Sequence, residues 1–88
     1  MAFRIDTLSD GHCTTIRLIG QFRAEHLPDL AAQIRTGVSR IVIDLEEITL
    51  VDLDAIRFLR DCETEGLVLI NCSPYITTWI AKERSGGT

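Results

Sequence analysis

The stretch RIVIDLEEITLVDLDAIRFL, residues 40–59, contains the change of pattern that decides the fold. Its first six residues, 40–45, form a short and mostly β-branched run, which is typical of a strand covered on both faces. Residues 46–50 link this run to a second pattern. From Leu53 the apolar residues recur at helical spacing, which predicts an amphipathic helix that ends at Gly66. A charged segment therefore lies where a strand passes into a helix, a position where α/β proteins commonly place functional residues.

The segments before this stretch predict a hairpin and a helix. Residues 3–8 and 14–19 alternate in part between apolar and polar side chains. They flank a turn signal at Asp10 and Gly11, which predicts a β-hairpin with a loop longer than two residues. After Gly20 the period changes to that of a helix ending near position 37, and its apolar face consists of Leu27, Leu30, Ala31 and Ile34.

The segments after this stretch predict one more strand and one more helix. Residues 67–70, LVLI, are typical of a buried strand. Ser73 is a good N-cap and Pro74 suits the first position of a helix. The apolar face of this third helix consists of Ile76, Trp79 and Ile80.

The predicted order is β-β-α-β-α-β-α, which defines the fold class as α/β. It predicts a small mixed four-stranded sheet, with an N-terminal hairpin, parallel later strands and three helices. Right-handed crossovers would place the first two helices on the same face of this sheet. Residues 1–84 are predicted to form a single domain, and residues 85–88 a flexible tail.

Composition and charge exclude several classes of function. The formal net charge of −4 argues against nucleic acid or an anionic membrane surface as a partner. No apolar run approaches the roughly 20 residues that span a bilayer, and the first residues lack a signal-peptide core. We therefore expect a cytoplasmic protein. The three cysteines are odd in number and show no C-x-x-C spacing, so we expect no metal site, disulfide or cofactor.

Three local patterns, taken in order, resemble one family. IRLIGQFRAEHLPDLAAQI, residues 16–34, resembles a strand with the motif L-x-G-x-x-D and its following helix. Residues 40–59 resemble the core motif of a hydrophobic residue, D-L, a spacer and D-S-x-G. GLVLINCSPYITTWI, residues 66–80, is similar to the last strand and the S-P opening of the final helix. Together they resemble the STAS domain of bacterial anti-sigma factor antagonists over about residues 14–83.

This resemblance implies a non-enzymatic regulatory domain with a phosphorylation switch. In the antagonists, a kinase-type anti-sigma factor phosphorylates the serine of D-S-x-G and binds the unmodified form. Here the aspartate falls on Asp52, the serine on Leu53, and the glycine on Ala55. Leu53 has no hydroxyl group, so the switch cannot operate at that position. The family's first acidic residue is also replaced, by Arg23.

Residues 52–57 admit three interpretations. As an acid–base pair, Asp52 and Asp54 would need a partner, and no His, Lys or Tyr lies beside them in sequence. As a helix start, Asp52 would be the N-cap and Asp54 would favour the helix dipole. As a binding surface that has lost its switch, the stretch would contact a protein through Asp52, Leu53, Asp54, Ala55 and Arg57, and this is the function we expect. Leu53 is the expected apolar anchor, provided that it is exposed.

The expected partner is a protein, specifically a kinase-type anti-sigma factor. The alternatives are a scaffold or sensory subunit of a larger signalling complex, or a diverged STAS module that binds a different partner or a small ligand. The outer edge of the first strand also predicts pairing with a second copy as a homodimer. Two further side chains, Phe22 and Phe58, would mark a contact patch if they are exposed.

Overall fold

A computed structural model describes residues 3–36 and 40–85, and their strands and helices alternate in the predicted order. The strands are β1 (Phe3–Ser9), β2 (Cys13–Phe22), β3 (Arg40–Val51) and β4 (Val68–Ile70). The helices are α1 (Leu27–Thr36), α2 (Leu53–Thr64) and α3 (Pro74–Ser85), and one 3-10 turn, η1 (Ala24–His26), precedes α1.

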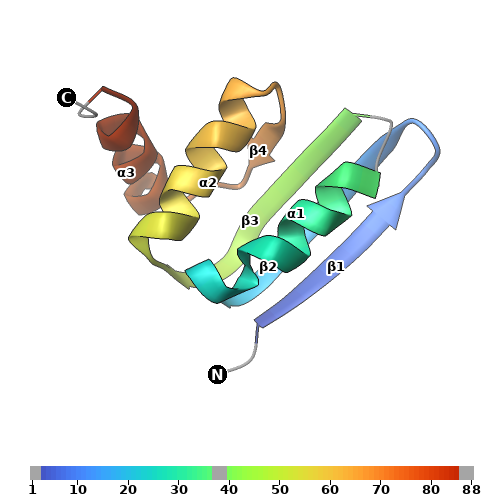
Figure 1. Cartoon of the computed structure of the whole chain (residues 1–88), viewed down its shortest axis with the longest axis horizontal. Coiled ribbons are helices and arrows are strands. Elements are labelled where there is room, and N and C mark those ends of the chain that lie inside the picture. The colour runs from blue at the N-terminus through green and yellow to red at the C-terminus, as the bar shows by residue number, and fades with distance from the viewer. Residues whose placement is uncertain (1–2, 37–39, 86–88) are drawn as a thin grey trace.

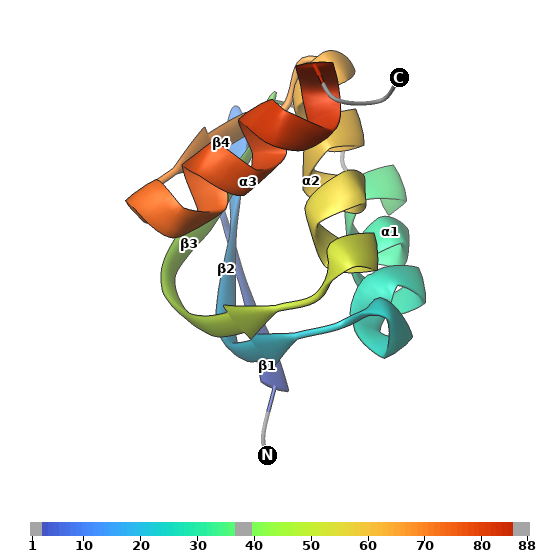
Figure 2. The same ribbon diagram turned by 90° about the vertical axis from the view of Figure 1, so that its left-hand side faces the viewer.

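The four strands form one mixed sheet in the order β1-β2-β3-β4. The β1–β2 pair is antiparallel, and the β2–β3 and β3–β4 pairs are parallel, which confirms the predicted topology. Helices α1 and α2 lie on the same face of this sheet, as right-handed crossovers require. Helix α3 packs against α2 at the β4 end of the sheet (Figures 1 and 2).

The core lies between the sheet and the helices. Alternate residues of the two central strands face the helices, since side chains alternate between the two faces of a strand. The fully buried large side chains come from both layers: Ile16, Leu18, Phe22, Leu30, Ile43, Leu45, Ile56 and Leu59. The helix faces predicted from apolar spacing are therefore the faces that pack.

The central strands are longer than the sequence pattern predicted. β3 continues to Val51, so the segment expected to be a link is strand. Its second half pairs with the extended end of β2, where Phe22 lies opposite Val51. The register of the β2–β3 pair shifts between Arg17 and Ile19 and again between Gly20 and Gln21, as it does at β-bulges. Residues 46–50 have a polar pattern that does not predict a strand, because this part of β3 forms through hydrogen bonds with β2, which lies far away in sequence.

Two further expectations were wrong. β4 is not a buried strand, because it is the short edge strand of the sheet and Val68 and Ile70 are exposed. Phe22 is fully buried, where its ring stacks on Phe3 with centroids 5.6 Å apart, so it marks no contact patch; Phe58 is half-buried against the core. The predicted tail, residues 85–88, begins at the last residue of α3, Ser85, and residues 86–88 lie outside the described residues.

Candidate protein-binding surface at the start of helix α2

Two connecting segments meet at one end of the sheet. The parallel strands β2 and β3 both end there, and each passes directly into a helical segment. Figure 2 shows the β2–η1 and β3–α2 connections side by side at the lower end of the molecule. This is the end at which parallel sheets commonly form their sites, because the connections leaving the carboxyl ends of the strands gather there.

Asp52 joins these two connections. Its Oδ1 accepts a hydrogen bond from the Ala55 N–H at 2.9 Å, which confirms the predicted N-cap of α2. Its Oδ2 accepts a second hydrogen bond from the Ala24 N–H at 3.0 Å. The second bond was not predicted, because Ala24 lies 28 positions earlier in the chain. Both oxygens are thus engaged with backbone donors, which identifies Asp52 as a structural link between the two connections.

The other four predicted residues divide into exposed and buried groups. Leu53, Asp54 and Arg57 are exposed on the first turns of α2, and Leu53 retains 39% of its accessible surface. Arg57 donates through Nε to Glu83 Oε1 at 3.1 Å and so ties α2 to α3. Ala55 is fully buried, so its contribution is packing and the N–H bonded to Asp52. We name Leu53, Asp54 and Arg57 the α2-start surface.

A cationic side chain lies on the β2–η1 connection, one residue before the Ala24 N–H that donates to Asp52. Arg23 is exposed, and its Nε and Nη2 donate to Gln21 Oε1 at 3.2 and 2.9 Å. The Arg23 N–H donates to Nδ1 of His26 at 3.1 Å, and the His26 ring stacks on Phe3 with centroids 4.0 Å apart. The sequence identified Arg23 only as a lost acid and did not predict the role of His26. The side chain at position 23, on the β2–η1 connection, therefore carries a charge opposite to that of the acidic residue in the family pattern.

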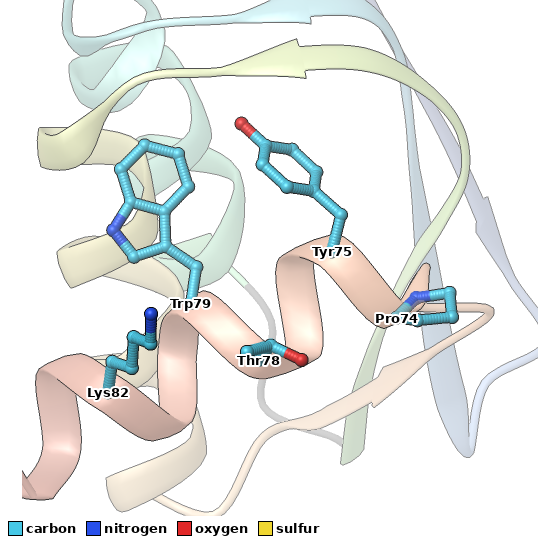
Figure 3. A pocket seen from close by; sticks show the side chains of 5 residues that line it. All are labelled: Pro74, Tyr75, Thr78, Trp79 and Lys82. Carbon is cyan, nitrogen blue, oxygen red and sulfur yellow. The ribbon is translucent and has the colours of Figure 1, made fainter.

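Helix α3 presents an open apolar groove of about 520 Å³. It is lined by Pro74, Tyr75, Thr78, Trp79 and Lys82. Figure 3 shows Tyr75 and Trp79 projecting from the same side of the helix, with ring centroids 5.7 Å apart. Trp79 was expected in the core, and it does pack against the core with part of its surface while it lines the groove with the rest. Tyr75, which is 57% exposed, was missed because it follows no apolar period.

Asp44, which aligns with the D-L of the family motif, is a buried structural carboxylate. Its Oδ1 accepts hydrogen bonds from the Glu46 N–H at 3.0 Å and from Asn71 Nδ2 at 3.1 Å. Arg17 Nε lies 3.7 Å from its Oδ2. Burial alone would raise the pKa of Asp44, but these two hydrogen bonds and the Arg17 charge outweigh it and lower the pKa below its ordinary value. Asp44 therefore stays ionised and ties β3 to Asn71, the residue that follows β4.

The cysteines are free, and within residues 3–36 and 40–85 no three potential metal ligands gather around one point. Over the same residues, every helix is too short or too polar to cross a bilayer.

Comparison with known proteins gives no match among protein-family models and none among curated sequences. Among solved structures, the anti-sigma factor antagonist SpoIIAA in its unphosphorylated form aligns with a TM-score of 0.65. The alignment covers 92% of this chain and 83% of that one, at 21% identity. This chain has the fold of SpoIIAA. The predicted STAS-like architecture is thereby confirmed at the level of the fold, and the function has to be argued from the surface.

Proposed function

We propose that this chain is a non-enzymatic protein-interaction domain of the anti-sigma factor antagonist type. Its partner would bind the α2-start surface, and the expected partner is a kinase-type anti-sigma factor. The support is the SpoIIAA-like fold together with the chemistry of the one loop that the family motif singles out. Both oxygens of Asp52 accept hydrogen bonds from backbone N–H groups, which favours a structural role over acid–base catalysis.

The observation that carries the proposal is the exposure of Leu53. An apolar side chain with 39% of its surface exposed lies at the first position of α2, next to the charged Asp54 and one helical turn before Arg57. Binding energy in protein interfaces concentrates in such apolar anchors surrounded by a polar rim. Burying the exposed Leu53 side chain against a partner would remove its apolar surface from water, which would favour binding.

The same residue decides the state of the surface. A phosphoserine at this position would bring a charge of about −1.5 to −2 to the helix start. Leu53 carries no charge and cannot be phosphorylated, so the surface would be held permanently in the form that resembles an unmodified antagonist. Binding would then be constitutive, and any regulation would act on the partner or on the amount of this protein.

The α3 groove favours a second candidate, a diverged STAS module that binds a small ligand. Its volume falls within the usual range for ligand sites, and an aromatic pair with a nearby Lys82 would suit a flat, anionic molecule. The groove is open along α3, however, which suits a protein surface better than a deep ligand site. A scaffold or sensory subunit of a larger complex would use the same α2-start surface with a different partner.

The test compares three baits in an affinity pull-down from lysate of the native organism. The wild type, Leu53→Arg and Leu8→Arg are immobilised, and circular dichroism verifies that each is folded. Leu8 is a matched control, because it is 75% exposed and lies at the opposite end of the sheet. The captured protein is identified by mass spectrometry, purified and titrated calorimetrically against each bait.

The proposal expects a kinase-type anti-sigma factor that binds the wild type and Leu8→Arg alike. Leu53→Arg should weaken this binding at least about tenfold. Equal binding by all three baits would remove the α2-start surface from the proposal. Capture of a different class of partner with the same dependence on Leu53 would favour the scaffold or sensory subunit.

A further inference from the structure

Within residues 3–36 and 40–85, the seven-residue strand β1 (Phe3–Ser9) pairs with β2 on one side and has no neighbouring strand on its outer edge. Such an edge exposes a row of backbone N–H and C=O groups that another strand can pair with. The ladder between β1 and β2 is regular over its whole length, without a bulge that would turn the edge away. The edge therefore retains the geometry of a strand that could accept a partner.

One hydrogen bond fixes which backbone groups point outward. The Asp10 N–H donates to the Cys13 carbonyl at 3.2 Å, and these two residues lie opposite each other in the continued β1–β2 register. Hydrogen-bonded and non-hydrogen-bonded pairs alternate along an antiparallel ladder. The even-numbered residues of β1 therefore bond to β2, and Phe3, Ile5 and Thr7 direct their N–H and C=O groups to the open edge.

The side chains of this edge carry a self-complementary charge pattern. Arg4 and Asp6 lie on the sheet face opposite α1, with exposed side-chain fractions of 69% and 50%. They are two positions apart and form an ion pair within the strand, with Arg4 Nη2 3.2 Å from Asp6 Oδ2. Arg4 and Asp6 flank Ile5. When two copies of this strand pair antiparallel and are centred on Ile5, Arg4 of each copy lies opposite Asp6 of the other.

We infer that β1 pairs with β1 of a second copy of this chain, antiparallel and with its two-fold axis at Ile5. In this register Ile5 lies opposite its own copy and Phe3 lies opposite Thr7, and these pairs exchange the outward hydrogen bonds. Arg4 then lies opposite Asp6 of the second copy in a non-hydrogen-bonded pair, where opposing side chains approach most closely. Two such charge pairs form, one on each side of the axis.

The charges exclude the neighbouring registers. If the two-fold axis lay at Arg4 or at Asp6 instead, each residue would pair with a residue two positions away from its partner in the Ile5 register. The outward-facing backbone groups of the two strands would still meet in these registers. They would place arginine opposite arginine, or aspartate opposite aspartate, and like charges directly opposite destabilise a sheet. The register centred on Ile5 is the one in which both charges find opposite partners.

The apolar side chains on the other face agree with this register. Phe3 and Ile5 are half-buried there and line a groove of about 400 Å³ between β1 and α1. Arg4, Asp29, Ala32 and Gln33 line the same groove. A second copy would pack its own Ile5 against this Ile5 and would cover the apolar side chains that line the groove. The two sheets would join into one continuous sheet, which removes both open β1 edges.

Charge exchange tests this inference. The wild type, Arg4→Asp, Asp6→Arg and the double variant are compared by sedimentation equilibrium up to about 100 µM, a range that detects micromolar association. The wild type and the double variant should dimerise, and each single variant should associate at least about tenfold more weakly, because like charges then face each other. A mixture of the two single variants should form a heterodimer, in which both charge pairs are restored.

Amide hydrogen exchange on the wild type gives an independent measurement that needs no variant. The amides of Ile5 and Thr7 should gain protection as the concentration rises, and that of Asp6 should not. A wild type that stays monomeric throughout, or single variants that dimerise as well as the wild type, would overturn the inference. So would a mixture of single variants that associates no better than either alone.

Discussion

Asp52 illustrates how one residue can stabilise a site from two directions. One oxygen caps α2 through Ala55, and the other accepts from Ala24 at the start of η1. The first bond is local and follows from helix capping, and the second joins the two connections that leave β2 and β3. The position of Leu53 is fixed by this residue, since Leu53 follows it directly.

Replacing Asp52 with alanine should remove both hydrogen bonds. We expect Asp52→Ala to lower the free energy of unfolding by about 1–3 kcal/mol, the sum of a lost cap and an unpaired Ala24 N–H. Asp52→Asn retains one acceptor oxygen and should lose less. Urea unfolding monitored by circular dichroism measures both variants. If the two variants are equally unstable, the charge of Asp52 rather than its two acceptors is what the fold requires.

Cys62 should be chemically inert in the folded protein. Burial, together with the negative charges of Glu65 and Asp61, raises the pKa of its thiol to about 12. The reactive thiolate is therefore almost absent at neutral and mildly alkaline pH. Alkylation with iodoacetamide at pH 8, followed by peptide mass spectrometry, should leave Cys62 unmodified until urea unfolds the chain. Rapid modification of Cys62 without denaturant would contradict this prediction.

At the scale of the elements, the β4–α3 connection depends on an unusual backbone conformation. Asn71 has a φ of 56°, in the left-handed region that asparagine tolerates better than most residues. Its side chain donates to Asp44 at 3.1 Å, so the same residue turns the chain out of β4 and ties that turn to β3. The Ser73 hydroxyl then accepts from the Ile76 N–H at 3.3 Å and caps α3.

Two substitutions separate the backbone contribution of Asn71 from that of its side chain. Asn71→Ala should cost about 1–3 kcal/mol of unfolding free energy, because it removes the hydrogen bond and leaves a Cβ at positive φ. Asn71→Gly also removes the hydrogen bond but adopts this φ without strain, and it should cost less. Thermal unfolding followed by circular dichroism orders the three proteins. The reverse order would show that the positive φ is not a constraint in solution.

At the scale of the whole molecule, acid stability should depend on Asp44 and Asp10. The pKa of each is lowered below 3.8, for Asp10 through hydrogen bonds from the His12 and Cys13 N–H groups. A lowered pKa in the folded state stabilises the fold at every pH above the unfolded value. This stabilisation is lost as the pH falls below about 4 and through the folded pKa values. Asp44→Asn should be less stable than wild type at pH 7.

The difference in unfolding free energy between Asp44→Asn and wild type should shrink as the pH falls from about 5 to about 2, because the wild-type carboxylate is then protonated. Urea unfolding at a series of pH values measures this convergence. Asp61→Asn is a suitable control, since Asp61 is exposed on α2 and forms an ion pair with the neighbouring Arg60. A constant difference between Asp44→Asn and wild type across the range would show that Asp44 is not the group that titrates.

The amino-acid sequence by itself determined the local features of this protein. The order of elements, the apolar faces of the helices, and the caps at Asp52 and Ser73 all follow from contacts within a few residues. The sequence also showed that Leu53 departs from the family motif, because the motif aligns with residues 40–59. These features are predictable because helix periodicity and capping depend on neighbours three or four positions apart.

Only the tertiary structure decided which surfaces remain open. The extension of β3, the exposure of β4 and the burial of Phe22 depend on which strands become neighbours and which strand forms the edge. The second hydrogen bond of Asp52 and the groove beside Tyr75 depend on segments far apart in sequence. Strand pairing and burial are set by long-range packing, which a one-dimensional pattern of polar and apolar residues does not encode.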